Sequence, residues 1–180
     1  MYLSIIASIL LLIGLDQFTK YLAVIFLKGT EGVALIPNVF ELVYVENKGA
    51  AFGIMQGGRW IFIVLTGLVL AAMLVLVLRG KFRSYPWMNV ASTLIIAGGI
   101  GNLIDRIAYG YVVDFLYVKL INFPVFNVAD CCVVIGAILL LILFLFFYKP
   151  EEKQSEEASE EQQDGNNNLD PNSGTSSEAD

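Results

Sequence analysis

Histidine is absent from this chain of 180 residues, and cysteine occurs only as the adjacent pair Cys131 and Cys132. The lack of histidine excludes Ser-His and Cys-His catalysis, histidine-ligated zinc and histidine proton relays. Two neighbouring cysteines inside an apolar run suit neither a disulfide framework nor a zinc site. Any chemistry of the chain must therefore depend on other side chains.

Charged residues are scarce before residue 150 and concentrated in 151–180. This tail has ten acids, one base (Lys153) and only three hydrophobic residues, so we expect it to be disordered. Seven acids and ten bases remain in the body, a net charge of +3. The overall charge of −6 therefore comes from the acids of the tail and does not indicate a basic ligand.

Long hydrophobic runs dominate the rest. Hydrophobic residues make up 57% of the chain and about two in three of its first 150 residues, too many for a small soluble globule. The uncharged run 60–78 would span about 28 Å as a helix, close to the bilayer core of about 30 Å. The pattern predicts an all-α membrane protein with four transmembrane helices, over 2–27, 60–78, 88–108 and 128–148.

Basic residues predict the orientation of these helices. Arg79, Lys81 and Arg83 lie between the second and third helices, and further lysines follow the fourth. The positive-inside rule then places both termini in the cytoplasm, with outer loops at about 29–59 and 109–127. We expect a membrane domain over 1–149 and a cytoplasmic acidic tail over 150–180.

Strand-forming residues occur in the first outer loop. Residues 38–47 are rich in Val, Phe and Tyr, the sequence Asn-Lys-Gly at 47–49 predicts a turn, and an extended run resumes at 50–55. This pattern predicts a small β-hairpin at the membrane surface. The second outer loop is aromatic and lightly charged, which favours a position in the membrane interface.

Nearly all polar residues of the body fall at one predicted level, the outer leaflet, whereas a transporter needs polar groups through its full depth. They are Asp16, Lys20, Asn47, Asn102, Asp105, Arg106, Asp114, Asn127 and Asp130.

Several of these residues have simple structural interpretations. Asp16 and Lys20 share a helix face at i,i+4, and we favour a structural ion pair for them. Asn102 and Arg106 lie on one side of the third helix, where a structural fastening and support of an active site are equally good explanations. Asn127, three residues before an acid at a helix start, fits an N-cap.

Two carboxylates, Asp114 and Asp130, lie at the same outer boundary. Two carboxylates close together cannot both ionise cheaply, so one keeps a proton and the pair can act as base and acid at once. The base activates a water that attacks a carbonyl, and the acid protonates the carbonyl oxygen. As a hypothesis, the helix N-terminus favours ionisation of Asp130 and leaves the proton on Asp114. This chemistry is aspartyl proteolysis.

Five motifs resemble those of bacterial lipoprotein signal peptidase, also called signal peptidase II, in the same order and spacing. They are LDQFTK (15–20), NKGAAFG (47–53), GNLIDR (101–106), VVDF (112–115) and FNVAD (126–130).

The resemblance implies an aspartic endopeptidase of the bacterial inner membrane that removes signal peptides from diacylglyceryl-modified prolipoproteins, cutting before the lipidated cysteine. It assigns the catalytic pair to Asp114 and Asp130. It assigns supporting or substrate-binding roles to Asp16, Lys20, Asn47, Asn102, Arg106 and Asn127. It implies a β-cradle near NKGAAFG and a short amphipathic helix in the second outer loop. Independently of the resemblance, the small residues Gly49, Ala50, Ala51 and Gly53 would admit a substrate with small residues at the cleavage site. No metal, organic cofactor or nucleic-acid partner is expected, and no oligomer is implied.

Other classes of protein remain open from the residues alone. A small transporter would function without Asp114, and a structural membrane protein would tolerate loss of either proposed catalytic Asp. A presenilin-type protease places one Asp in GxGD within a helix, whereas this chain has GGIGNLID.

Overall fold

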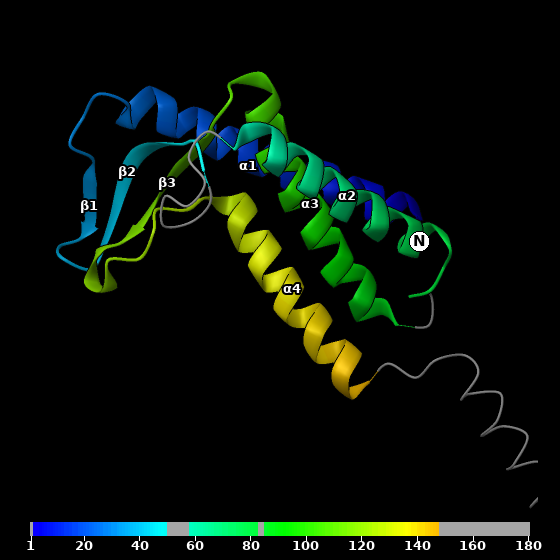
Figure 1. Ribbon diagram of the computed structural model, residues 1–180. Helices are drawn as coiled ribbons and strands as arrows, with labels where there is room; N and C mark the ends of the chain where they lie inside the picture. The colour runs from blue at the N-terminus through cyan, green and yellow to red at the C-terminus, as the bar shows by residue number, and fades with distance from the viewer. Residues whose placement is uncertain (1, 50–57, 83–84, 148–180) are drawn as a thin grey trace, which may run out of the picture. The chain divides into compact units, whose positions relative to one another are not determined.

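The computed structural model describes residues 2–49, 58–82 and 85–147 (Figure 1). The chain divides into one unit of residues 1–144 and a second of residues 145–180, of which only 145–147 are described. The elements are α1 (Tyr2–Leu27), β1 (Val33–Ile36), β2 (Phe40–Asn47), α2 (Arg59–Leu78), α3 (Pro86–Ala108), β3 (Val112–Val118), the 3-10 turn η2 (Lys119–Ile121) and α4 (Val128–Phe146).

Four helices of the described chain are long and apolar enough to cross a membrane: α1, α2, α3 and α4. Their length follows from the apolar runs, because about 20 apolar residues match the hydrocarbon core and a helix satisfies its own backbone groups in lipid. The four expected transmembrane helices are confirmed, and the chain is a multi-pass membrane protein.

The central helix is α3. Half of its most hydrophobic window is buried, against 11–17% for the other three helices. Glycines permit this close packing: a Cβ on Gly98 would overlap the backbone oxygen of Ala129 on α4, and one on Gly136 would lie 2.8 Å from the backbone oxygen of Ala91. Small residues at such crossings let two helix backbones approach.

A three-stranded antiparallel sheet, in the order β1-β2-β3, lies at the end of the bundle where α1 ends and α4 begins (Figure 1). We call this the sheet end. Strand β2 pairs with β3 from Phe40 opposite Val118 to Asn47 opposite Val112, with a shift in register between Leu42 and Val45. Because of this register, Asn47 and Asp114 lie near each other on neighbouring strands.

A small hydrophobic core fixes the sheet to the first helix. It consists of Ala23 and Leu27 from α1 together with Val113 and Phe115 from β3, all at most 7% exposed. Since strand residues alternate between faces, anchoring Val113 and Phe115 constrains the Asp114 side chain between them to the opposite side.

The small β-structure expected on the outer face is present as a three-stranded sheet. Strand β2 lies within the expected 38–47 segment, but its partners are β1 and β3, and the expected run 50–55 lies outside the described residues. The second outer loop, for which a short amphipathic segment is expected, forms strand β3 over Val112–Val118 and has helical geometry only in η2. Val, Phe and Tyr favour an extended chain, and pairing with β2 supplies its backbone hydrogen bonds.

Candidate active site

The polar side chains singled out in the sequence converge at the sheet end. In chain order, they are Asp16 and Lys20 of α1, Asn47 of β2, Asn102, Asp105 and Arg106 of α3, Asp114 of β3, and Asn127 and Asp130 at the start of α4. Hydrogen bonds and ion pairs join all of them into one network. Four separate elements and the start of a fifth therefore supply one site.

A single ammonium group holds the deep part of this network. Lys20 Nζ lies 2.9 Å from Asp16 Oδ2 and 3.1 Å from Asp105 Oδ2, and it donates to Asn102 Oδ1 at 3.0 Å. The side chains of Lys20 and the two acids are at most 4% exposed. Buried charges require such pairing, so the expected pair of Asp16 and Lys20 is present and extends to a third charge.

Both acids of this cluster also bind backbone. Asp16 Oδ1 accepts a hydrogen bond from Ala129 N at 2.9 Å, and Asp105 Oδ2 accepts one from Val113 N at 3.1 Å. Ala129 immediately precedes Asp130, and Val113 immediately precedes Asp114. The Lys20 cluster thus fixes the chain one residue ahead of each candidate aspartate.

One residue of the cluster had no predicted role. Gln17 Nε2 donates to Asp105 Oδ1 at 3.0 Å and to the Gly101 backbone oxygen at 3.2 Å. It follows Asp16 in the LDQFTK motif, and this adjacency is the only signal the sequence offered. Its bonds tie α1 to α3 beside Lys20.

Two asparagines connect the cluster to the candidate aspartates. Asn102 Oδ1 accepts from Lys20 and from Asn127 Nδ2, the latter at 3.1 Å, while Asn102 Nδ2 donates to Asp130 Oδ1 at 2.7 Å. Asn127 Nδ2 donates to Asp114 Oδ1 at 2.6 Å. Each amide therefore presents its donor to one carboxylate.

Asn127 and Asp130 cap the start of α4, as expected. Asp130 N donates to Asn127 Oδ1 at 2.9 Å, and Asn127 N donates back to Asp130 Oδ2 at 3.1 Å. This reciprocal arrangement is that of a capping box. Asn127 consequently contacts both candidate aspartates, and the cap and the site are the same structure.

Asp114 is 1% exposed and receives hydrogen bonds at both oxygens, from Asn127 and, at 2.8 Å, from Asn47 Nδ2. Burial, reinforced by the charge of Asp130, raises the pKa of Asp114 to about 6, against the opposing effect of the two hydrogen bonds. A carboxyl group with this pKa can hold or release a proton near neutral pH.

A cavity of about 310 Å³ between α2, α3 and α4 leads to this network. Its wall is largely apolar, with Leu65, Val69 and Val133 among its members, and its polar lining includes Asn102, Arg106 and Asp130. An apolar cavity with a few convergent polar groups is the usual form of a binding site.

Arg106 occupies the polar end of that cavity. It donates to the Asn102 backbone oxygen at 3.3 Å and to the Gly49 backbone oxygen at 3.5 Å, and its guanidinium lies 5.1 Å from the centre of the Phe62 ring. Of the small residues expected to admit substrate, only Gly49 is described, since 50–57 lie outside the described residues. No group of three or more potential metal ligands occurs among the described residues.

Comparison with known proteins identifies relatives over most of the chain. The family model described as Signal peptidase (SPase) II matches residues 8–146. The lipoprotein signal peptidase of Streptococcus thermophilus is 44% identical over 127 residues, 71% of this chain and 82% of the relative. That of Brevibacillus brevis is 46% identical over 131 residues, 72% of this chain and 85% of the relative.

Solved structures agree with this relationship. A bacterial membrane enzyme determined at 2.3 Å is 33% identical, with a TM-score of 0.74, and the match covers 79% of this chain and 87% of that one. A second, at 1.9 Å, has a TM-score of 0.72 and 33% identity, covering 81% and 94%. The chain therefore belongs to the signal peptidase II family of membrane aspartic peptidases, which remove signal peptides from prolipoproteins.

Proposed function

We propose that this chain cleaves diacylglyceryl-modified prolipoproteins immediately before the lipidated cysteine, with Asp114 and Asp130 as its catalytic acid and base. The observation that carries the proposal is the position of Asn127, which hydrogen-bonds to both carboxylates. One of the two, Asp130, lines the apolar cavity. Paired carboxylates held in this way match the family's aspartic peptidase chemistry.

The proposed reaction uses one protonated and one ionised carboxyl group. The ionised Asp130 removes a proton from water as the water oxygen attacks the scissile carbonyl, and Asp114 donates its proton to the carbonyl oxygen. The tetrahedral intermediate then collapses, the C–N bond breaks, and the leaving amine takes a proton from the dyad. The pKa of Asp114, raised to about 6, supports its role as the proton holder.

The remaining polar residues would orient this pair. Asn102 and Asn127 fix the two carboxylates, Asn47 fixes Asp114 from the sheet, and the cluster of Asp16 and Lys20 anchors the backbone. Arg106, which lines the polar end of the cavity, would contact the substrate backbone. The apolar wall between α2, α3 and α4 would receive the hydrophobic segment of the signal peptide.

Cleavage by the full chain in lipid tests the assignment. With a diacylglyceryl-modified prolipoprotein as substrate, we expect Asp114→Asn and Asp130→Asn each to reduce signal-peptide release by about 10²–10⁴-fold. Glu46→Gln makes the same chemical change on β2, where Glu46 pairs with Lys28, and should retain activity. Release that survives either dyad substitution would remove that residue from the chemistry, and cleavage of an unlipidated substrate would refute the lipid requirement.

We also propose that the sheet end faces outward from the bacterial inner membrane and that both termini are cytoplasmic. The basic residues Arg79 and Lys81 follow α2 at the opposite end of the bundle, which supports this orientation. Protease added to right-side-out vesicles should leave the acidic tail intact, whereas inverted vesicles should lose it. The reverse pattern would refute the orientation.

A further inference from the structure

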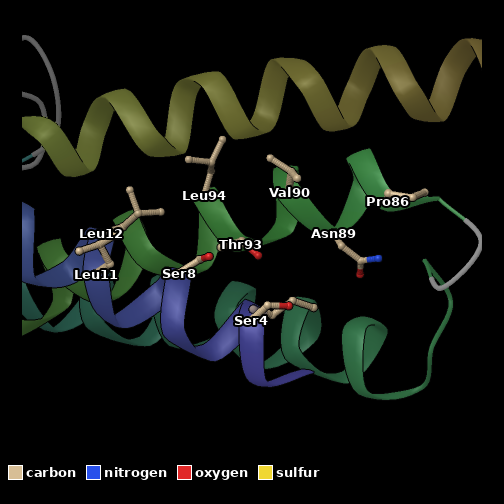
Figure 2. Close-up of a pocket in the computed structure, with 10 residues that line it drawn as sticks. Ser4, Ser8, Leu11, Leu12, Pro86, Asn89, Val90, Thr93 and Leu94 are labelled. Atoms are coloured by element: carbon tan, nitrogen blue, oxygen red, sulfur yellow. The ribbon is translucent and has the colours of Figure 1, made fainter. Parts of the chain in front are cut away.

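A second cavity, of about 590 Å³, lies between α1 and α3 at the end of the bundle away from the sheet. Figure 2 shows its lining, with Ser4 and Ser8 on α1 and Asn89 and Thr93 on α3. None of these residues belongs to the network around Asp114. Its volume lies within the range of about 300–1,000 Å³ that is usual for small-molecule sites.

The polar side chains of the lining lie toward the starts of the two helices, among the apolar residues Ile5 and Val90, and none lies at the deepest level. Ser4 and Asn89 lie near the helix starts, Ser8 and Thr93 follow one turn deeper, about 6 Å along each axis, and the deepest side chains are leucines such as Leu12. A phospholipid shows the same order along its length, from phosphate through glycerol esters to acyl chain. The cavity therefore matches the ester region and one acyl chain of a phospholipid in that orientation.

Thr93 provides the second observation. Its residue is only 7% exposed, it lines the cavity, and its hydroxyl has no hydrogen-bond partner among the described residues. The neighbouring Ser92 instead donates to the Met88 backbone oxygen at 2.7 Å. Unsatisfied polar groups are unfavourable in a membrane, so the Thr93 hydroxyl indicates an acceptor on a ligand.

Positive charge lies beside the mouth of this cavity. Asn89 Nδ2 donates to the Phe82 backbone oxygen at 2.9 Å and so fastens α3 to the turn that carries the exposed residues Arg79 and Lys81. The two helices that line the cavity contain no Asp or Glu before Asp16 on α1 and Asp105 on α3. This charge favours an anionic headgroup.

We propose that the cavity between α1 and α3 binds one anionic glycerophospholipid, with an acyl chain between the helices and its phosphate near Arg79 and Lys81. The hydroxyls of Ser8 and Thr93 donate to the lipid's ester carbonyl oxygens. The lipid stabilises the bundle in the leaflet opposite the proposed active site. This site is independent of the proposed cleavage reaction, since it shares no residue with it.

The test uses the full chain in bilayers of equal phosphatidylglycerol and phosphatidylcholine, followed by mild extraction and native mass spectrometry. We expect one retained phosphatidylglycerol per chain, in at least about fivefold preference over phosphatidylcholine. The double variant Ser8→Ala/Thr93→Val removes both hydroxyls with little change of shape and should lower retention about fivefold to tenfold. Ser92→Ala is the matched control and should retain lipid, because its hydroxyl bonds within α3.

Charge is tested separately by Arg79→Gln/Lys81→Gln, which should abolish the preference for phosphatidylglycerol. Equal retention in the double hydroxyl variant, no lipid preference in the wild type, or a copurifying protein helix in place of lipid would each overturn the proposal.

A second readout is available in Trp87, which is exposed beside the cavity rim. In a Trp60→Phe background, brominated phosphatidylglycerol should quench Trp87 more than brominated phosphatidylcholine does, and equal quenching would contradict the site. Signal-peptide release by each variant verifies that it is folded.

Discussion

Asp16 accepts a hydrogen bond from the backbone N–H of Ala129 at 2.9 Å, although 113 positions separate the two residues. Asp105 makes the corresponding bond to Val113, and Lys20 lies between the two acids. Each acid holds the backbone directly before one member of the proposed dyad. The spacing of the dyad is consequently coupled to one buried ammonium group on α1.

The first prediction concerns that ammonium. Lys20→Met leaves Asp16 and Asp105 buried beside each other without a cation, and removing one partner of a buried ion pair typically costs about 3–5 kcal/mol. We expect a lower thermal unfolding midpoint in lipid and little signal-peptide release. Lys28→Met, which removes a solvent-exposed pair with Glu46, is the control and should change neither quantity greatly. An unchanged midpoint in Lys20→Met would show that the buried cluster is not needed for the fold.

The second prediction concerns packing against Asp16. A Cβ on Gly101 would lie 2.6 Å from Asp16 Oδ2, so Gly101→Ala must displace the carboxylate that binds Ala129 N. We expect destabilisation of about 1–3 kcal/mol and reduced cleavage. Gly67→Ala on α2, where nothing lies within 4 Å of the added methyl group, is the matched control. Unfolding midpoints and rates that are the same for both variants would refute the close contact.

The third prediction is a pH dependence. If Asp114 must hold a proton, kcat/KM should fall about tenfold per pH unit above about 6, where this carboxyl ionises. The pKa of Asp114 in the folded protein lies above its ordinary value of 3.8, so proton binding contributes stability below about pH 4 that is lost as the pH rises through about 6. Cleavage rates measured between about pH 5 and 8 test the first statement, and unfolding midpoints over about pH 4–7 test the second. A flat rate profile would exclude Asp114 as the acid.

The fourth prediction separates the role of Asn47 from a purely structural one. Its amide donates to Asp114 Oδ2 and thereby favours the ionised form of that carboxyl group. Asn47→Ala should raise the pKa of Asp114 further and move the descending limb of the pH profile toward alkaline pH by up to about one unit. Glu46→Gln, on the adjacent residue, should leave the limb in place. An Asn47→Ala limb at the wild-type pH would show that this hydrogen bond does not control the proton.

Infrared difference spectroscopy with isotopically labelled Asp114 addresses the same proton directly. We expect a protonated carboxyl band for Asp114 below about pH 6. A band that instead follows Asp130 would reverse the proposed acid and base.

The sequence by itself determined the four helices and the level at which the polar residues gather. The uncharged run 60–78 is long enough to cross the bilayer whatever surrounds it, and an apolar run of this length forms a helix from its own residues. The capping of α4 by Asn127 was equally local, because the interacting groups lie three residues apart. That Asn127 contacts both Asp114 and Asp130 agrees with their predicted position at one membrane boundary.

Only the tertiary structure decided how the strands pair and which hydrogen bonds and ion pairs hold the residues next to Asp114 and Asp130. Strand β3 pairs with β2 across a separation of about 70 residues, and local preferences do not encode which strands will meet. The second outer loop, for which a short amphipathic segment is expected, therefore forms strand β3 over Val112–Val118. The hydrogen bonds of Asp105 and Gln17 also depend on helices that meet only after folding, as does the cavity between α1 and α3. Helix packing brings together side chains that are far apart in the sequence, and no sequence pattern predicts which of them will meet.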